Sequence, residues 1–214
     1  MGFLETAIVV YLRALYYPNG FMFPLSIMDP QIGVIEIVRE AATIIMLSTV
    51  GILAGRSTNQ RFAFFLATFA IWDIFYYVFL KVFLGWPESF LTWDILFLIP
   101  VPWIGPVLAP CMISTTMLIL AVVLVYRDAQ NTSYRLSLLE WIFLFVGSFV
   151  VVASWTMDFL SYNVDSATTN SNTSAIATYI PLSYNWYLFC IGEVLLLIAT
   201  YLFWKRTSKT RISS

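Results

Sequence analysis

Long apolar runs separated by short polar turns dominate the chain from residue 32 onward. A helix needs about 20 apolar residues to cross a bilayer, and five of these runs reach that length. Backbone N–H and C=O groups in lipid must be satisfied within the segment, so each run is expected to be a helix. The predicted spans are Ile32–Ala54, Phe62–Leu84, Trp103–Val125, Ser137–Phe159 and Tyr184–Trp204.

The composition agrees with a membrane location. The chain has 214 residues, of which 60% are hydrophobic and only 11% are charged, whereas soluble domains carry about 25% charged residues. A soluble domain of this size could not bury so much apolar surface, because its surface is too large relative to its volume. We therefore predict an all-α integral membrane helical bundle, a single transmembrane domain over residues 1–214, with the lipid bilayer as a partner. The net charge of −1 provides no basic field for nucleic acid.

A short amphipathic pattern precedes the first span. Residues Phe3–Tyr17 place Glu5 and Arg13 on one side of a helix and Leu4 and Leu15 on the other. Because about fifteen residues are few for a span, we expect an interfacial helix within an N-terminal segment of residues 1–30. A tilted sixth span is the alternative. The chain start lacks the cationic region and cleavage site of a signal peptide.

The basic residues predict an orientation in the membrane. They gather in three connecting segments, residues 55–61, 127–135 and 205–214. The positive-inside rule places these segments in the cytoplasm, with the N-terminus outside and the C-terminus inside. A Ser/Thr/Asn-rich loop, residues 163–183, then lies outside, and its Asn-Thr-Ser triplet at 172–174 has the spacing of an N-glycosylation acceptor. We therefore expect the protein in the cell membrane.

One apolar segment is interrupted by prolines. Residues 92–110 read TWDILFLIPVPWIGPVLAP, and the prolines at 100 and 102 each remove a backbone donor and disfavour a helix in the preceding residue. We expect a short proline-broken helix, about Ser89–Ile99, followed by an extended turn. This helix either is re-entrant and packs on the bundle, or lies at the interface with tryptophans at headgroup level.

Several charged residues fall inside the predicted spans. With a rise of about 1.5 Å per residue, Asp73 and Glu193 lie at the middle of their spans, and Glu40 lies roughly 4–5 Å from the middle of its own. A charge at the bilayer centre costs about 2.5–3.5 kcal/mol on insertion scales, so these carboxylates must face the bundle interior. We predict an ion or proton pathway through these three residues, with Arg39 beside them and Glu36 one turn away. The formal charge of −2 for the three carboxylates and Arg39 leads us to expect that at least one carboxyl holds a proton.

A structural interpretation of the same residues stays open, namely a hydrogen-bonded network that holds the helices together. The Trp-Asp-Ile sequence occurs twice, and we expect Asp94, in the second copy, to be more exposed and more tolerant of substitution than Asp73. Asp94 and Asp158 are expected near the outer face, either as an acidic vestibule with Glu36 or as ordinary interfacial carboxylates. At the inner end, Glu140 is expected to meet a neighbouring arginine, Arg135.

The residue types limit the possible chemistry. The chain has no histidine, which excludes His-ligated haem, His-containing zinc or copper sites and a Ser-His-Asp triad. Cys111 and Cys190 lack the CxxC spacing and are expected to be core residues. A carboxylate-only metal site would need ligands from different spans, so we predict no metal and no cofactor. Because no nucleophile–base pair is visible, we favour a role that is not enzymatic.

The central segment resembles part of a known group of proteins. Residues 69–110, FAIWDIFYYVFLKVFLGWPESFLTWDILFLIPVPWIGPVLAP, are similar to a segment of small multi-pass bacterial membrane proteins of unassigned function. The resemblance implies a bacterial inner-membrane setting and no particular activity.

Two functional hypotheses follow. The first is a transport module that handles a proton or a small cation through the carboxylates. The second is a non-catalytic subunit of a larger, bioenergetic membrane complex, with other membrane subunits or further copies of itself as partners. A water-filled route to the carboxylates would favour transport, and a dry, fully paired cluster would favour the subunit.

Overall fold

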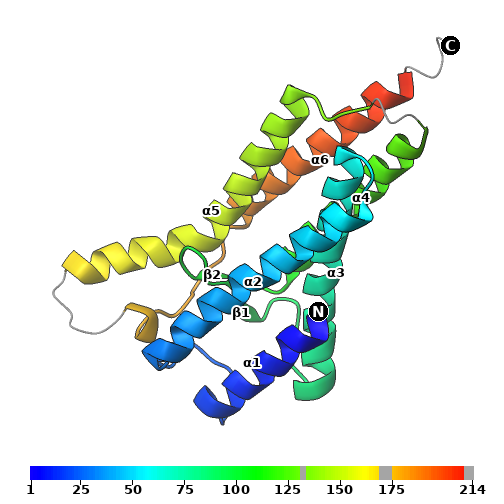
Figure 1. The fold of residues 1–214 in the computed structure, drawn as a ribbon. Coiled ribbons are helices and arrows are strands. Elements are labelled where there is room, and N and C mark those ends of the chain that lie inside the picture. The colour runs from blue at the N-terminus through cyan, green and yellow to red at the C-terminus, as the bar shows by residue number, and fades with distance from the viewer. Residues whose placement is uncertain (131–133, 169–174, 210–214) are drawn as a thin grey trace.

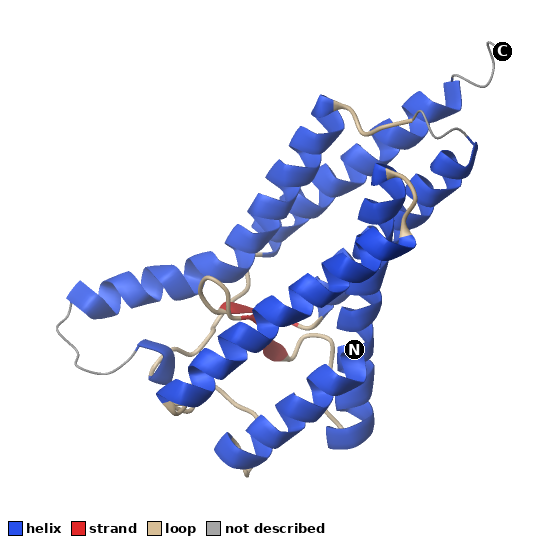
Figure 2. Ribbon diagram, in the orientation of Figure 1, coloured by secondary structure: helices blue, strands red, loops and turns tan. Residues whose placement is uncertain are grey.

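The computed structural model describes residues 1–130, 134–168 and 175–209 (Figures 1 and 2). The Asn-Thr-Ser triplet at 172–174, and the last five residues of the basic tail, lie outside the described residues. The elements are the helices α1 (Gly2–Tyr16), α2 (Pro30–Ala54), α3 (Thr58–Leu84), α4 (Leu108–Gln130), α5 (Leu138–Thr168) and α6 (Trp186–Lys209), the strands β1 (Trp93–Phe97) and β2 (Trp103–Pro106), and the short 3₁₀ helix η1 (Ala175–Ala177).

The prediction of an all-α, multi-pass membrane protein is confirmed. The five helices α2 to α6 are long and apolar enough to cross a membrane, so the protein contacts a lipid bilayer. Neighbouring helices pack in the order α5, α6, α4, α3 and α2, and α1 packs on α3 (Figure 1). The third span begins at Leu108 and not at Trp103, because residues 103–106 belong to β2.

The two ends of the bundle differ in chemistry. We call the end with β1 and β2 the hairpin end. The opposite end, the arginine-rich end, carries Arg56, Arg61, Arg127, Arg135 and Arg206. Because successive spans alternate in direction, α2, α4 and α6 end there, and α3 and α5 begin there.

Hydrogen bonds between side chains join the helices at the arginine-rich end. Asp128 of α4 accepts hydrogen bonds from Ser57 at 2.8 Å and from Gln60 at 2.7 Å. Glu140 of α5 is buried and pairs with Arg206 of α6 at 2.8 Å. The expectation that Glu140 meets Arg135 was wrong, because α5 and α6 pack side by side and bring Arg206 onto the carboxylate.

The N-terminal helix runs along α3. Gly2 lies against the backbone of Trp72 and Phe75, near the middle of α3. The Thr6 hydroxyl donates a hydrogen bond to the Tyr76 carbonyl oxygen at 3.2 Å. These contacts follow α3 from its middle toward the hairpin end. The helix α1 therefore lies alongside this half of α3 and is not confined to the end of the bundle.

The polar side of α1 faces the protein. Gly2, Thr6 and Arg13 are buried, whereas Leu4 and Leu15 are 63% and 66% exposed. An amphipathic helix at the membrane–water interface would turn its polar side away from the protein, toward water. The reversed orientation is the one expected where lipid surrounds the helix, because lipid solvates apolar side chains and leaves polar ones to find partners in the protein.

A β-hairpin replaces the expected proline-broken helix. Strands β1 and β2 pair antiparallel, with Asp94 opposite Gly105 and a register shift between Ile95 and Phe97. The helix expected over Ser89–Ile99 was wrong, because residues with aromatic or β-branched side chains before and after the prolines pair with each other as strands. Pro100 and Pro102 then lie in the connection between the strands, where they take no ladder hydrogen bond.

The hairpin packs inside the protein against α5. Ile104 is buried, and the Trp103 ring stacks on the Trp155 ring with centroids 5.6 Å apart. Non-helical backbone at membrane depth is tolerated when it is buried in protein or lines a cavity. The loop backbone after β1 meets this condition through Leu98, whose N–H donates a hydrogen bond to Glu40 of α2 at 2.9 Å.

Close packing of α5 and α6 depends on glycine. A Cβ atom added to Gly192 would lie 2.7 Å from the Val151 side chain and 2.9 Å from the Gly147 carbonyl oxygen. Small residues allow helix backbones to approach closely in membranes, where packing has to replace the hydrophobic effect.

We therefore predict that Gly192→Ala destabilises the bundle by about 1–3 kcal/mol, the usual cost of overpacking. The matched control is Gly33→Ala, because a Cβ at Gly33 has no neighbour within 4 Å. Thermal unfolding of the purified protein in detergent measures both. Equal unfolding temperatures for the two variants would contradict the proposed close contact.

Candidate functional site

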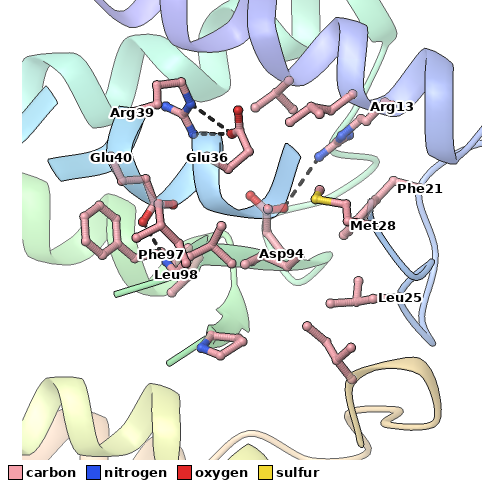
Figure 3. Close-up of a pocket in the computed structure, with 18 of the residues that line it drawn as sticks. Arg13, Phe21, Leu25, Met28, Glu36, Arg39, Glu40, Asp94, Phe97 and Leu98 are labelled. Carbon is pink, nitrogen blue, oxygen red and sulfur yellow. Dashed lines mark hydrogen bonds and ion pairs between the residues drawn. The ribbon is translucent and has the colours of Figure 1, made fainter. Parts of the chain in front are cut away.

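A cavity of about 630 Å³ opens at the hairpin end. Its walls come from α1, residues 17–28, α2, α3, the hairpin with its connecting loop, and α5 (Figures 1 and 3). Ligand pockets in proteins have volumes of roughly 300–1,000 Å³, so this cavity has the size of a binding site for a small molecule. The hairpin therefore does more than fill space, because it forms one wall of the cavity.

Charged residues of both signs line this cavity. With all groups ionised, five carboxyls and two guanidiniums give a formal charge of −3. The carboxyls are Glu5, Glu36, Glu40, Asp73 and Asp94, and the guanidiniums are Arg13 and Arg39. The structure thus brings together four of the five residues predicted for the pathway, Glu36, Arg39, Glu40 and Asp73, and adds Glu5, Arg13 and Asp94 to them.

Arg39 joins two carboxylates from different helices. It pairs with Glu36 one turn away on α2 at 2.8 Å, and it also pairs with Glu5 of α1. Glu36 and Arg39 are neighbours on the helix surface by their i, i+3 spacing. The Arg39 charge is therefore shared by two carboxylates and ties α1 to α2.

Arg13 holds the second ion pair. Its guanidinium lies 3.5 Å from Asp94 of β1 and rests over the Trp86 ring, 3.7 Å from the ring centroid. Asp94 also accepts a hydrogen bond from the Tyr77 hydroxyl at 3.2 Å. Asp94 is 2% exposed, so the expectation that it lies near the surface was wrong. The hairpin carries this aspartate inward, onto the polar side of α1.

Glu40 and Asp73 differ from these three carboxylates. Neither takes part in an ion pair with any residue that the structure describes. One oxygen of Glu40 accepts the backbone N–H of Leu98, and one oxygen of Asp73 accepts the Ser114 hydroxyl at 2.8 Å. Each carboxyl therefore has one oxygen held by a neutral donor and no directly paired cation among the described residues.

Glu193 does not line the cavity. It accepts a hydrogen bond from Thr116, and its other oxygen is buried with no hydrogen-bond partner among the described residues. On α4, Thr116 faces Glu193 of α6, while Ser114 faces Asp73 of α3. Two residues apart on a helix correspond to about 200° of rotation. The body of α4 therefore separates Glu193 from Asp73, although the two carboxyls fall at similar positions along their spans.

Sequence reasoning assigned no role to Glu5 or Arg13, and it considered Asp94 only as a vestibule residue or an ordinary interfacial carboxylate. The available signal was the polar side of the N-terminal helix, which in lipid has to face the protein. Asp158, the remaining vestibule candidate, accepts a hydrogen bond from the Tyr179 hydroxyl and is not part of the cavity wall. The acidic residues that line the cavity thus come from α1, α2, α3 and β1.

Burial changes the proton affinity of Asp94. Burial raises the pKa of Asp94 to about 6, although the charge of Arg13 and hydrogen bonds from the Ile95 backbone and Tyr77 act in the opposite direction. At pH values between 3.8, the ordinary pKa, and about 6, the folded protein binds this proton more tightly than the unfolded chain does. The contribution of Asp94 to the free energy of unfolding must therefore increase as the pH falls through this window.

We predict that Asp94→Asn removes this pH dependence, because the amide does not titrate. The difference in unfolding free energy between the native protein and the variant should change by on the order of 1–3 kcal/mol between pH 7 and pH 4. Unfolding curves in detergent at several pH values measure this, with Glu88→Gln at an exposed position as the control. If the unfolding free energies of the native protein and of Asp94→Asn change with pH in the same way, the raised pKa of Asp94 is contradicted.

Comparison with models of protein families, with curated proteins and with solved structures found no match, so the geometry of the cavity is the basis for assigning a function.

Proposed function

We propose that the protein is a membrane transport module in which Glu40 and Asp73 bind or relay a proton or a cation that enters through the cavity. The observation that carries the proposal is that both carboxyls line the cavity while neither has a cationic partner among the described residues. Both guanidiniums of the cavity already pair with other carboxylates.

Glu40 and Asp73 carry negative charge that no ion pair with a described residue balances. An unpaired charge near the bilayer centre costs several kcal/mol, and a proton or a cation at the carboxylate removes most of that cost. Arg13 pairs with Asp94, and Arg39, whose charge also acts on Glu40, pairs with Glu5 and Glu36. A bound proton or cation would supply the positive charge that is still needed.

The proposal includes an orientation. We place the arginine-rich end in the cytoplasm by the positive-inside rule, so that the cavity at the hairpin end opens to the outside of the cell membrane. The loop before α6 then lies outside, with Leu182 at its exposed surface, and the beginning of α3 lies inside, where its first residue, Thr58, is exposed.

We predict that a membrane-impermeant maleimide labels Leu182→Cys in intact cells and labels Thr58→Cys only after the cells are opened. The two native cysteines are first replaced by alanine, since Cys190 is exposed. Labelling of Thr58→Cys in intact cells would show that the protein has the opposite orientation.

We predict that proteoliposomes containing the protein take up protons or Na⁺ under an imposed membrane potential, as followed by an entrapped pH- or Na⁺-sensitive dye. Glu40→Gln and Asp73→Asn should each lower the rate by about tenfold or more, because a contact with a charged group is worth about 1.5–3 kcal/mol. Glu88→Gln, at an exposed position, should leave the rate unchanged.

Uptake no faster than in protein-free liposomes would contradict the proposal. The protein would then be better described by the other hypothesis, a non-catalytic subunit of a larger membrane complex.

A further inference from the structure

We infer that the cavity takes an amphipathic organic cation, a positively charged ammonium or phosphonium group carried on an apolar body. This inference rests on the proposed function and names the class of its substrate. Three independent features support it, namely the size of the cavity, the kind of side chains opposite the carboxylates, and the sign of the charge that remains.

The first feature is size. A proton or a bare metal cation needs only a few oxygen atoms around it, whereas this cavity has a volume of about 630 Å³. That volume lies in the range of pockets that enclose most of a drug-sized ligand. A site selected only for small ions would gain nothing from so much space.

The second feature is the apolar wall. Residues 17–28, the hairpin and α5 contribute apolar or aromatic side chains to the same cavity, and Figure 3 shows Leu25, Met28 and Phe97 around the space that Glu40 and Asp94 also line. An apolar body placed against these groups is stabilised because its surface is removed from water. Aromatic faces also attract cations, as Arg13 over the Phe21 ring, 4.6 Å from the ring centroid, illustrates within this site.

The third feature is charge. The cavity carries a formal charge of −3 with all groups ionised, and both of its guanidiniums are committed to carboxylates. An anionic ligand would have to displace one of these pairs, and a neutral ligand would leave Glu40 and Asp73 without compensation. A cation is the ligand that such a potential favours.

The helix face that carries Glu40 also leaves room for a bulky ligand. Gly33, Glu36, Ile37 and Glu40 lie on one face of α2 by their spacing, and all four line the cavity. A Cβ atom added at Gly33 would meet nothing within 4 Å, so this part of the wall is open space. Val34, the next residue, is 61% exposed and does not line the cavity.

The test compares two ions of the same shape and opposite charge. Binding of tetraphenylphosphonium and tetraphenylborate to the full chain in lipid nanodiscs is measured, and binding to empty nanodiscs is subtracted. We expect tetraphenylphosphonium to bind at least tenfold more tightly than tetraphenylborate. Equal affinities would show a merely apolar cavity and would overturn the inference, as would the absence of any binding above empty nanodiscs.

Two substitutions locate the site. Gly33→Phe should fill the cavity and lower tetraphenylphosphonium affinity by tenfold or more, whereas Val34→Phe adds the same ring on the outward face and should leave it unchanged. Glu40→Gln should also lower the affinity by about tenfold and should reduce the preference over tetraphenylborate. If Gly33→Phe does not fold, as judged by gel filtration, the Glu40→Gln result decides. Unchanged affinity in Glu40→Gln would overturn the inference.

The outcome separates this inference from the proposed function. Proton or Na⁺ uptake that depends on Glu40 and Asp73, in a protein that does not bind tetraphenylphosphonium, would leave the transport proposal standing and would reject the organic cation. Binding of tetraphenylphosphonium without any ion uptake would support the ligand class and would count against transport of protons or Na⁺.

Discussion

Polar groups inside a membrane must find their partners within the protein, because lipid offers none, and this constraint organises the whole structure. It explains why α1 turns Thr6 and Arg13 toward the protein and leaves Leu4 and Leu15 outside. At the arginine-rich end, the buried Glu140 is likewise balanced by Arg206 of the adjacent helix.

The β-hairpin satisfies the same constraint for a segment that cannot be a helix. Its prolines lack N–H groups, and the two strands satisfy part of the remaining backbone by pairing with each other. The connecting loop finds a further partner in Glu40, which accepts the N–H of Leu98. Glu40 of α2 thus holds the loop of the hairpin and also presents its carboxyl to the cavity. The position of the hairpin wall and the charge of the cavity therefore depend on the same side chain.

The charges that line the cavity do not balance. Arg13 and Arg39 pair with three carboxylates, and two more, Glu40 and Asp73, are held only by neutral donors. An uncompensated buried charge is costly. An excess of negative charge beside an open, largely apolar space is an arrangement that a cationic ligand can complete.

Several features of this protein follow from the sequence alone, and others required the tertiary structure. Apolar runs of sufficient length identify the five spans, because the thickness of the bilayer sets the length of a spanning helix. Depth along a helix likewise follows from the residue count, and this count predicted that Glu40 and Asp73 lie near the middle of the membrane. Depth says nothing about direction around the helix, so only the packing of α4 between Asp73 and Glu193 could show that these carboxyls are separated. The pairing of β1 with β2 depends on contacts across the proline-containing connection, and only that pairing carries Asp94 into the interior beside Arg13.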